Sequence, residues 1–290
     1  LDTTIIFGSP PCQALSAARS GTTEEQRAGG LALVKWTLDL LLETLPTQEG
    51  RKPFVFLCEN VVSAKLSELL AKFKHQHHGS FDYASLQLRD YGTPTDRRRM
   101  IFGSKALIAK LVETKPVTAP SVADVLGNEA IGGATHLKNS SSLIDESGVR
   151  VPSIRPLTCP GFTVCATHPL LLADGTGATV RCLNAREQAK LMTFPDDWKL
   201  PVKSRDAVHA VGNSVPPAFS RKATELAIEA LEEMAKADEE ASKQEEDMEP
   251  EKMVDGKQIL HKINRIQVQN KRLKRRLESI ESTLRKYSLD

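Results

Sequence analysis

Residues 4–13 read TIIFGSPPCQ, and this stretch decides how the rest of the chain is interpreted. The apolar, β-branched run 4–7 predicts a buried strand, and the Gly-Ser-Pro-Pro that follows predicts an abrupt end to it. In an open α/β sheet, reacting groups lie at this carboxyl edge of the strands. Cys12 is therefore placed as a nucleophile would be. The alternative is that Cys12 is a small buried side chain, as most free cysteines are.

A second apolar run, PFVFLC at 53–58, leads directly into Glu59. A carboxylate at the end of a neighbouring strand can act as a general acid or as an orienting group. By itself such a residue is more often a solvated charge. Together with Cys12, it predicts a thiol and a carboxyl group at one edge of a sheet.

Four further motifs follow along the chain. Each one alone could be a turn or a solvated loop. In this order and spacing, the set that starts at Pro-Cys-Gln resembles the DNA (cytosine-5)-methyltransferase family over roughly residues 1–230. The motifs are YGTPTDRRR at 91–99, LNARE at 183–187, FPDD at 194–197 and GNSVPP at 212–217.

The resemblance implies that Cys12 attacks C6 of a cytosine while Glu59 holds and protonates N3. C5 then becomes nucleophilic enough to take a methyl group from S-adenosylmethionine, the implied cofactor. Arg97 and Arg99 complete the implied catalytic set, because they match the family's Gln-x-Arg-x-Arg motif; Thr95 stands where Gln is usual. The chemistry needs a soft thiolate nucleophile and a base that is swung out of the duplex.

The resemblance also implies two groups of binding residues. The implied cofactor-binding residues are Pro10, Asn213, Ser214 and Val215. The implied substrate-binding residues are Gln13, Asn60, Val61, Arg98 and Thr163. Arg186 and Glu187 match a structural motif of the family.

One family motif is missing. Members of the family carry a Phe-x-Gly-x-Gly loop that cradles S-adenosylmethionine, and no such loop precedes Cys12 or follows a strand later in the chain. The sequence therefore predicts an incomplete cofactor site. We expect either a fragment or a catalytic half whose cofactor-binding segment lies on another chain.

The expected fold class is α/β, with a Rossmann-like methyltransferase sheet that is mostly parallel and incomplete at its N-terminal side. We expect catalytic core at 1–103 and again at 155–234. Between them, 104–154 is either a small target recognition insert or a surface loop. An acidic linker is expected at 235–254 and an α-helical coiled coil at 255–290.

The coiled-coil prediction rests on apolar residues that alternate four and three apart over 259–287, with the polar Asn270 at one core position. A single polar core residue of this kind favours a parallel pair, so we expect a homodimer. The alternative is one amphipathic helix that folds back on the globular part.

Composition excludes several classes of protein. The five cysteines have no paired spacing, which argues against a disulfide framework and a zinc site, so no metal is expected. No apolar run is long enough for a membrane span. With a net charge of +2, affinity for double-stranded DNA has to come from local clusters. We expect an intracellular protein, nuclear if the source is a eukaryote.

Two alternative functions remain. The chain could be a lapsed methyltransferase domain that serves as a dimerising DNA-binding module. It could also methylate cytosine in tRNA, as one branch of the family does. That branch carries a Cys-Phe-Thr signature, whereas the nearest match here is Gly-Phe-Thr at 161–163, so DNA is favoured.

Overall fold

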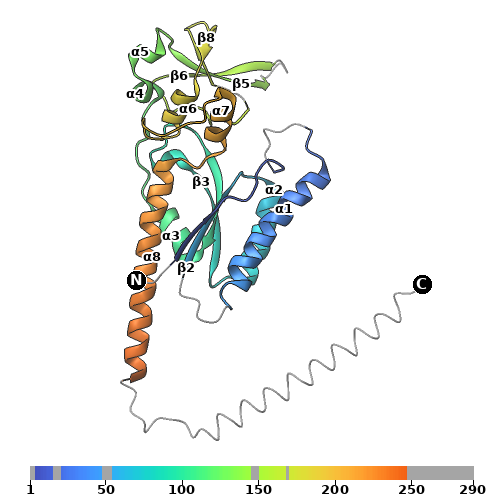
Figure 1. Cartoon of the computed structure of the whole chain (residues 1–290), viewed down its shortest axis with the longest axis vertical. Helices are drawn as coiled ribbons and strands as arrows, with labels where there is room; N and C mark the ends of the chain where they lie inside the picture. Colours follow the sequence, from blue (N-terminus) through green and yellow to red (C-terminus); the bar gives the residue numbers. More distant parts are fainter. Residues whose placement is uncertain (1–3, 16–20, 48–53, 145–149, 168–169, 247–290) are drawn as a thin grey trace, which may run out of the picture. The chain divides into compact units, whose positions relative to one another are not determined.

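The computed structural model describes residues 4–15, 21–47, 54–144, 150–167 and 170–246. Within them the chain forms two four-stranded sheets with helices around them (Figure 1). This confirms the α/β class. The predicted coiled coil at 255–290 and the end of the predicted acidic linker lie outside the described residues.

The first sheet has the strand order β1-β2-β4-β3. Its strands are β1 (Thr4–Gly8), β2 (Phe54–Asn60), β3 (Phe81–Gln87) and β4 (Arg98–Ser104). β1 and β2 pair in parallel, with Gly8 opposite Cys58. β4 runs antiparallel to both of its neighbours. The expectation of a mostly parallel sheet is therefore wrong for β4: two of the three strand pairings are antiparallel, although three of the four strands run the same way.

Helices cover both faces of the first sheet (Figure 1). On one face lie α1 (Glu24–Asp39), which continues into the π-helical turn η1 (Leu40–Thr44), and α2 (Ala64–Gln76). On the other lie α3 (Lys105–Glu113) and the first half of α8 (Pro217–Glu246). Strand β2 serves both layers, because Phe56 and Cys58 pack on the α1–α2 side while Val55 and Leu57 pack on the α8 side.

The second sheet has the order β6-β5-β7-β8 and is antiparallel throughout. Its strands are β5 (His136–Ile144), β6 (Arg150–Pro156), β7 (Leu170–Ala173) and β8 (Thr179–Cys182). Four short helices share a hydrophobic core with it, namely α4 (Val122–Leu126), α5 (Asn128–Ile131), α6 (Ala185–Leu191) and α7 (Ser204–Asn213).

The region 104–154 was expected to be either a target recognition insert or a surface loop. Most of its described residues lie in helices and strands. It begins with α3, which packs on β3 and β4, and it then supplies α4, α5, β5 and part of β6 to the second sheet and its helices. The expected boundary at residue 154 falls inside β6. At the far end, α8 runs on as a helix to Glu246, so the first part of the expected linker is helical.

Strand β1 lies at one edge of the first sheet. Among the described residues it pairs only with β2, so its outer edge carries no partner strand. The phenyl ring of Phe7 is 49% exposed there. The carboxyl ends of β1 and β2, by contrast, meet the start of β4, and this corner holds the residues described next.

Candidate active site

Glu59 lies at the centre of the corner where β1, β2 and β4 meet. It is the penultimate residue of β2 and is only 8% exposed. Nε of Arg99 lies 2.8 Å from Oε1 of Glu59, and the hydroxyl of Ser9 donates to Oε2 at 3.0 Å. The carboxylate is thus held between the start of β4 and the loop that follows β1. Ser9 was not singled out in the sequence, although it adjoins the nucleophile loop.

Cys12 is half-buried in the loop after β1. Burial raises the pKa of its thiol, and the negative charge of Glu59 raises it further, while Arg99 and Arg97 act in the opposite direction. The loop that carries Cys12 is joined to the end of β2 by the hydrogen bonds of Ser9 to Glu59 and of Asn60 to Pro10. At neutral pH the thiol therefore keeps its proton and needs a base to take it.

Asn60 holds the nucleophile loop in place. Its side chain is fully buried, and Nδ2 donates to the carbonyl of Pro10 at 3.0 Å. Its Oδ1 accepts from the backbone N–H of Val61 at 2.8 Å. With its amide occupied on both sides, Asn60 acts on the position of Cys12 and is not placed to bind a base. Val61 itself is half-buried against the core beside α1 and α2.

Arg97, the residue before β4, is 2% exposed. Its guanidinium donates to the carbonyls of Val164 at 3.0 Å, Gly212 at 3.2 Å and Ser214 at 2.8 Å. Burial and the neighbouring Arg99 lower the pKa of Arg97 to about 9. The sequence motif predicted that Arg97 contacts the substrate, but in the structure its guanidinium donates to three backbone carbonyls.

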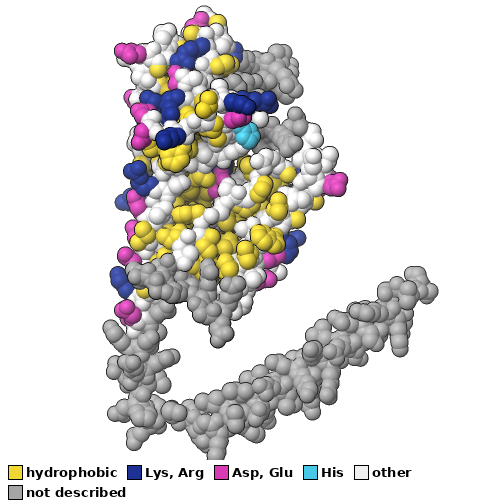
Figure 2. Space-filling model, in the orientation of Figure 1, with side chains coloured by type: hydrophobic (Ala, Val, Ile, Leu, Met, Phe, Trp, Pro, Cys, Tyr) yellow, Lys and Arg dark blue, Asp and Glu magenta, His cyan; other side chains and the backbone are white. Residues whose placement is uncertain are grey.

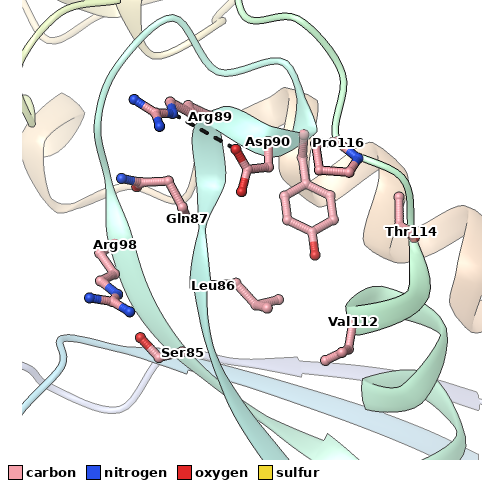
Figure 3. Close-up of a pocket in the computed structure, with 10 residues that line it drawn as sticks. Ser85, Leu86, Gln87, Arg89, Asp90, Arg98, Val112, Thr114 and Pro116 are labelled. Carbon is pink, nitrogen blue, oxygen red and sulfur yellow. Dashed lines mark ion pairs between the residues drawn. The ribbon is translucent and has the colours of Figure 1, made fainter.

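Arg98 points away from this corner. It is exposed and lines a separate cavity of about 440 Å³ beside β3 and the end of α3. Figure 3 shows Arg98, Gln87 and Ser85 along one side of that cavity and Val112 on the other. The three consecutive arginines thus separate, because neighbouring residues of a strand face opposite ways.

Asp96 and Thr95 join the two sheets. The carboxylate of Asp96 pairs with Arg155 at 2.6 Å and with Arg89 at 2.7 Å, and its backbone carbonyl accepts a hydrogen bond from the hydroxyl of Thr163. Thr95 is fully buried and bridges to Gly161. Asp96 was not expected to matter, because a lone acid before three arginines gives no signal in sequence, whereas Arg155 lies in a stretch that resembles the strand anchoring the family's recognition domain.

The remaining residues that were expected to bind the substrate or the cofactor differ in their exposure to solvent. Gln13 is exposed, whereas Pro10 is buried. Asn213 is exposed at the end of α7, with Nδ2 3.3 Å from the ring of His209. Ser214 is half-buried, and its hydroxyl donates to the carbonyl of Val211 at 2.7 Å. Val215 packs against the core beneath α8.

A second thiol adjoins the site. Cys165 is half-buried, and its pKa is raised by burial while Arg97 and Arg99 lower it. It was not expected in the site, because no motif surrounds it in the sequence. In the part of the chain that the structure describes, no group of histidine, cysteine or acidic side chains could hold a metal ion. No described helix has the length and apolarity of a membrane span.

Comparison with known proteins gives one family. The family model described as C-5 cytosine-specific DNA methylase matches residues 2–142 and 131–229. Type II methyltransferase M.MthTI of Methanothermobacter thermautotrophicus is 26% identical over 73% of this chain and 74% of its own length. Type II methyltransferase M1.HphI of Haemophilus parahaemolyticus is 24% identical over 77% of this chain and 68% of its own length.

Similar solved structures include two methyltransferases. Entamoeba histolytica EhMeth aligns with a TM-score of 0.47 and 15% identity, covering 78% of this chain and 77% of that one. The Dnmt2 methyltransferase of S. pombe aligns with a TM-score of 0.46 and 18% identity, covering 79% and 78%.

Proposed function

Because the chain belongs to the C-5 cytosine-specific DNA methylase family, we propose that it forms the nucleophilic and base-holding part of an S-adenosylmethionine-dependent DNA (cytosine-5)-methyltransferase. The observation that carries the proposal is the contact of the Cys12 loop with the Glu59–Arg99 pair: Ser9 donates to Glu59, and the carbonyl of Pro10 accepts from Asn60. A thiol and a carboxyl group after the ends of β1 and β2, with a guanidinium at the start of β4, are the groups that addition to cytosine requires.

In the proposed addition, the carboxyl group of Glu59 carries a proton from the thiol of Cys12 to N3 of the cytosine. The thiol of Cys12 gives its proton to the carboxylate of Glu59, and the sulfur forms a bond to C6 of the flipped cytosine. The carboxyl group of Glu59 then passes a proton to N3, which becomes basic as C6 is attacked. Burial raises the pKa of Cys12, so this transfer is needed to generate the thiolate.

Arg99 is the arginine we assign to the cytosine. Its guanidinium contacts Glu59 through Nε, and Nη1 donates to the carbonyl of Arg98 at 2.8 Å, which leaves Nη2 for the base or a nearby phosphate. Arg97 and Asn60, expected to touch the substrate, are both committed to internal carbonyls. Gln13, which is exposed, stays a candidate substrate contact, whereas the hydroxyl of Thr163, also expected to bind the substrate, donates to the backbone carbonyl of Asp96.

The described residues do not make a complete site for S-adenosylmethionine. Of the four residues expected to bind it, Val215 packs in the core, Pro10 is buried, and the hydroxyl of Ser214 donates to Val211. Only the side chain of Asn213 is exposed. The cofactor supplies the methyl group when bound, and we derive no step through it from this chain alone.

We propose that a further cofactor-binding segment pairs with the outer edge of β1. The edge has no partner strand among the described residues. Figure 2 shows hydrophobic side chains gathered on the face that carries β1 and α1. Phe7 on β1 and Leu33 and Trp36 on α1 are 49%, 48% and 64% exposed. An unpaired aliphatic edge next to exposed apolar side chains suits an added strand.

The decisive test is hydrogen exchange at cytosine C5, because it needs only the residues of this chain. When Cys12 adds to C6, C5 becomes an enamine carbon that can take a deuteron from D2O. Loss of the original proton and release of the cysteine then leave deuterium at C5. We expect the chain to label cytosine in duplex DNA without S-adenosylmethionine, measured by mass spectrometry of the released nucleosides.

The controls separate the alternatives. Cys12→Ser should abolish labelling, whereas Cys165→Ser, which removes the neighbouring thiol, should retain it. No labelling by the folded wild-type chain would favour the lapsed, DNA-binding module. Labelling of tRNA but not of duplex DNA would favour the tRNA methyltransferase.

Two proposals complete this picture. We propose that the segment 259–287 forms the homodimer that its heptads predict, which analytical ultracentrifugation of chains with and without residues 255–290 would test. We also propose an intracellular location, which is the nucleus if the source is a eukaryote, because duplex DNA is found there.

A further inference from the structure

Arg97 joins three separate backbone segments. It precedes β4 of the first sheet, while Val164 lies in the connection after β6, and Gly212 and Ser214 lie at the end of α7. Three hydrogen bonds of 2.8 to 3.2 Å run from one guanidinium to these carbonyls. Hydrogen bonds from a buried charged donor are among the stronger ones in proteins, and their acceptors would otherwise be left unpaired.

Asp96, the residue before Arg97, also binds the connection after β6. Its backbone N–H donates to the carbonyl of Gly161 at 2.8 Å, and its carboxylate pairs with Arg155 at 2.6 Å. The guanidinium of Arg155 also donates to the carbonyl of Gly161 at 3.2 Å and lies over the ring of Phe162, 4.5 Å from its centre. The segment 161–164 is therefore held along its whole length by residues 96 and 97.

The close approach of Gly212 supports the same conclusion. A Cβ atom on Gly212 would lie 2.2 Å from the backbone nitrogen of Ala166 and 2.4 Å from the carbonyl carbon of Cys165. The end of α7 and the connection after β6 thus touch backbone to backbone, directly beside the carbonyl that Arg97 binds. No side chain can be inserted at this contact without moving one of the two segments.

Arg97 is also electrostatically coupled to the nucleophile. Its charge lowers the pKa of Cys12, and it acts on Cys165 in the same direction. The guanidinium is nevertheless 2% exposed, and three of its donor contacts are taken. It can influence the thiol through charge but has no open path to a base.

We propose that Arg97 is a positioning residue that holds the segment 161–164 and the turn 212–214 to the start of β4, and that it does not itself touch the cytosine. The statement that Arg97 does not touch the cytosine rests on the proposed function. Its structural part stands independently, because the three carbonyl contacts do not depend on any substrate.

The experiment measures amide hydrogen exchange in the full chain without DNA or cofactor, so that its outcome does not depend on activity. We compare Arg97→Met, which keeps the length of the side chain but cannot donate, with Arg99→Met. In Arg97→Met, we expect about tenfold or faster exchange in peptides covering 161–166 and 211–216, with α2 unchanged. In Arg99→Met, these peptides should exchange as in the wild type.

A second readout distinguishes positioning from a purely structural role. The pH dependence of alkylation at Cys12 should move upward in Arg97→Met, because a positive charge is lost, and should return toward the wild type in Arg97→Lys. If Arg97→Met does not fold, Arg97→Lys carries the exchange measurement, with a smaller but local increase expected.

Two results would overturn the proposal. Unchanged exchange at 161–166 and 211–216 in Arg97→Met would show that Arg97 does not hold these segments. Loss of C5 labelling in Arg97→Met with wild-type exchange and a wild-type alkylation profile would assign Arg97 to the substrate instead. A wild-type chain that fails to label cytosine would refute the proposed function and leave the exchange result standing.

Discussion

Nε of Arg99 lies 2.8 Å from Oε1 of Glu59, and both side chains are nearly buried. The pair joins the end of β2 to the start of β4, two strands that run in opposite directions. A charge pair of this kind contributes little when solvated but is costly to break when buried. Because Glu59 and Arg99 both affect the pKa of Cys12, a substitution at either residue should change the pH dependence of its thiol.

Replacing Glu59 by Gln should make the thiol of Cys12 more acidic. The carboxylate raises the pKa of Cys12, second only to burial, so its loss lowers that pKa and moves the alkylation profile to lower pH. C5 labelling should nevertheless fall by about 10² to 10⁴-fold, because no group remains to carry the proton to N3.

The measurement is alkylation of the Cys12 peptide as a function of pH, followed by mass spectrometry. Asp39→Asn, which removes a surface carboxylate paired with Lys35 on α1, serves as the matched control and should leave the profile unchanged. A Glu59→Gln profile that moved upward would contradict the placement of the two groups.

Replacing Asn60 by Ala should loosen the nucleophile loop. Both halves of this buried amide are hydrogen-bonded, so its removal leaves the Pro10 carbonyl without a donor and should cost about 2 kcal/mol in unfolding free energy. Urea denaturation measures the loss. Asn213→Ala, at an exposed amide, should change the stability by less than about 0.5 kcal/mol. Equal effects at the two sites would rule out the special role of Asn60.

Two glycine-to-alanine changes should act in opposite directions. In Gly212→Ala the new methyl group meets backbone at 2.2 Å, so we expect a loss of about 1–3 kcal/mol. In Gly29→Ala, inside α1, the Cβ meets nothing within 4 Å, so the better helix propensity of Ala should add about 0.5–1 kcal/mol. Thermal unfolding of the two variants checks the sign of each change, and a stabilised Gly212→Ala would contradict the close contact.

The contribution of Glu187 to the stability of the folded chain should be lost in acid. Burial alone would raise the pKa of Glu187, but hydrogen bonds from Arg181 and from the backbone of Asn184 outweigh it and hold the pKa below its usual value. Its contribution is therefore complete above the ordinary value of 4.5 and is lost as the pH falls through the lower value of the folded state.

The corresponding measurement is unfolding free energy as a function of pH in Glu187→Gln. The variant should be less stable than the wild type at pH 7, and the difference should shrink below pH 4.5. Glu233→Gln, at an exposed carboxylate paired with Lys110, should show neither effect. A constant difference at all pH values would mean that Glu187 acts through packing alone.

The sequence predicted the strands of the first sheet well where apolar runs end in strong breakers. The run at 4–7 became β1, although the expectation that this strand is buried is wrong, because β1 is an edge strand and none of its residues is buried. The run at 53–58 became β2, with Glu59 next to its last residue. The direction of β4 could not be predicted, because periodicity carries no information on which way a strand runs. The apolar run at 31–42 predicts a helix, but α1 begins earlier, at Glu24, where Thr23 and Gln26 form a capping box.

The site was predictable as a set of residues but not as a set of roles. The motif gave Arg97 and Arg99 the same role, yet the structure buries Arg97 and pairs Arg99 with Glu59, while Arg98 lies exposed at another cavity. Asn60 and Asp96 acquire their contacts from segments far away in the chain. Such contacts depend on tertiary packing, which a local motif does not encode.

The outer edge of β1, which has no partner strand among the described residues, has a consequence for handling the protein. A free aliphatic edge can template pairing with another copy, which is how soluble sheets begin to aggregate. Solubility of the isolated chain is therefore tied to whatever covers residues 4–8. A preparation that precipitates alone and stays clear when a complementary strand is supplied would reveal the natural neighbour of this edge before any methyl group is transferred.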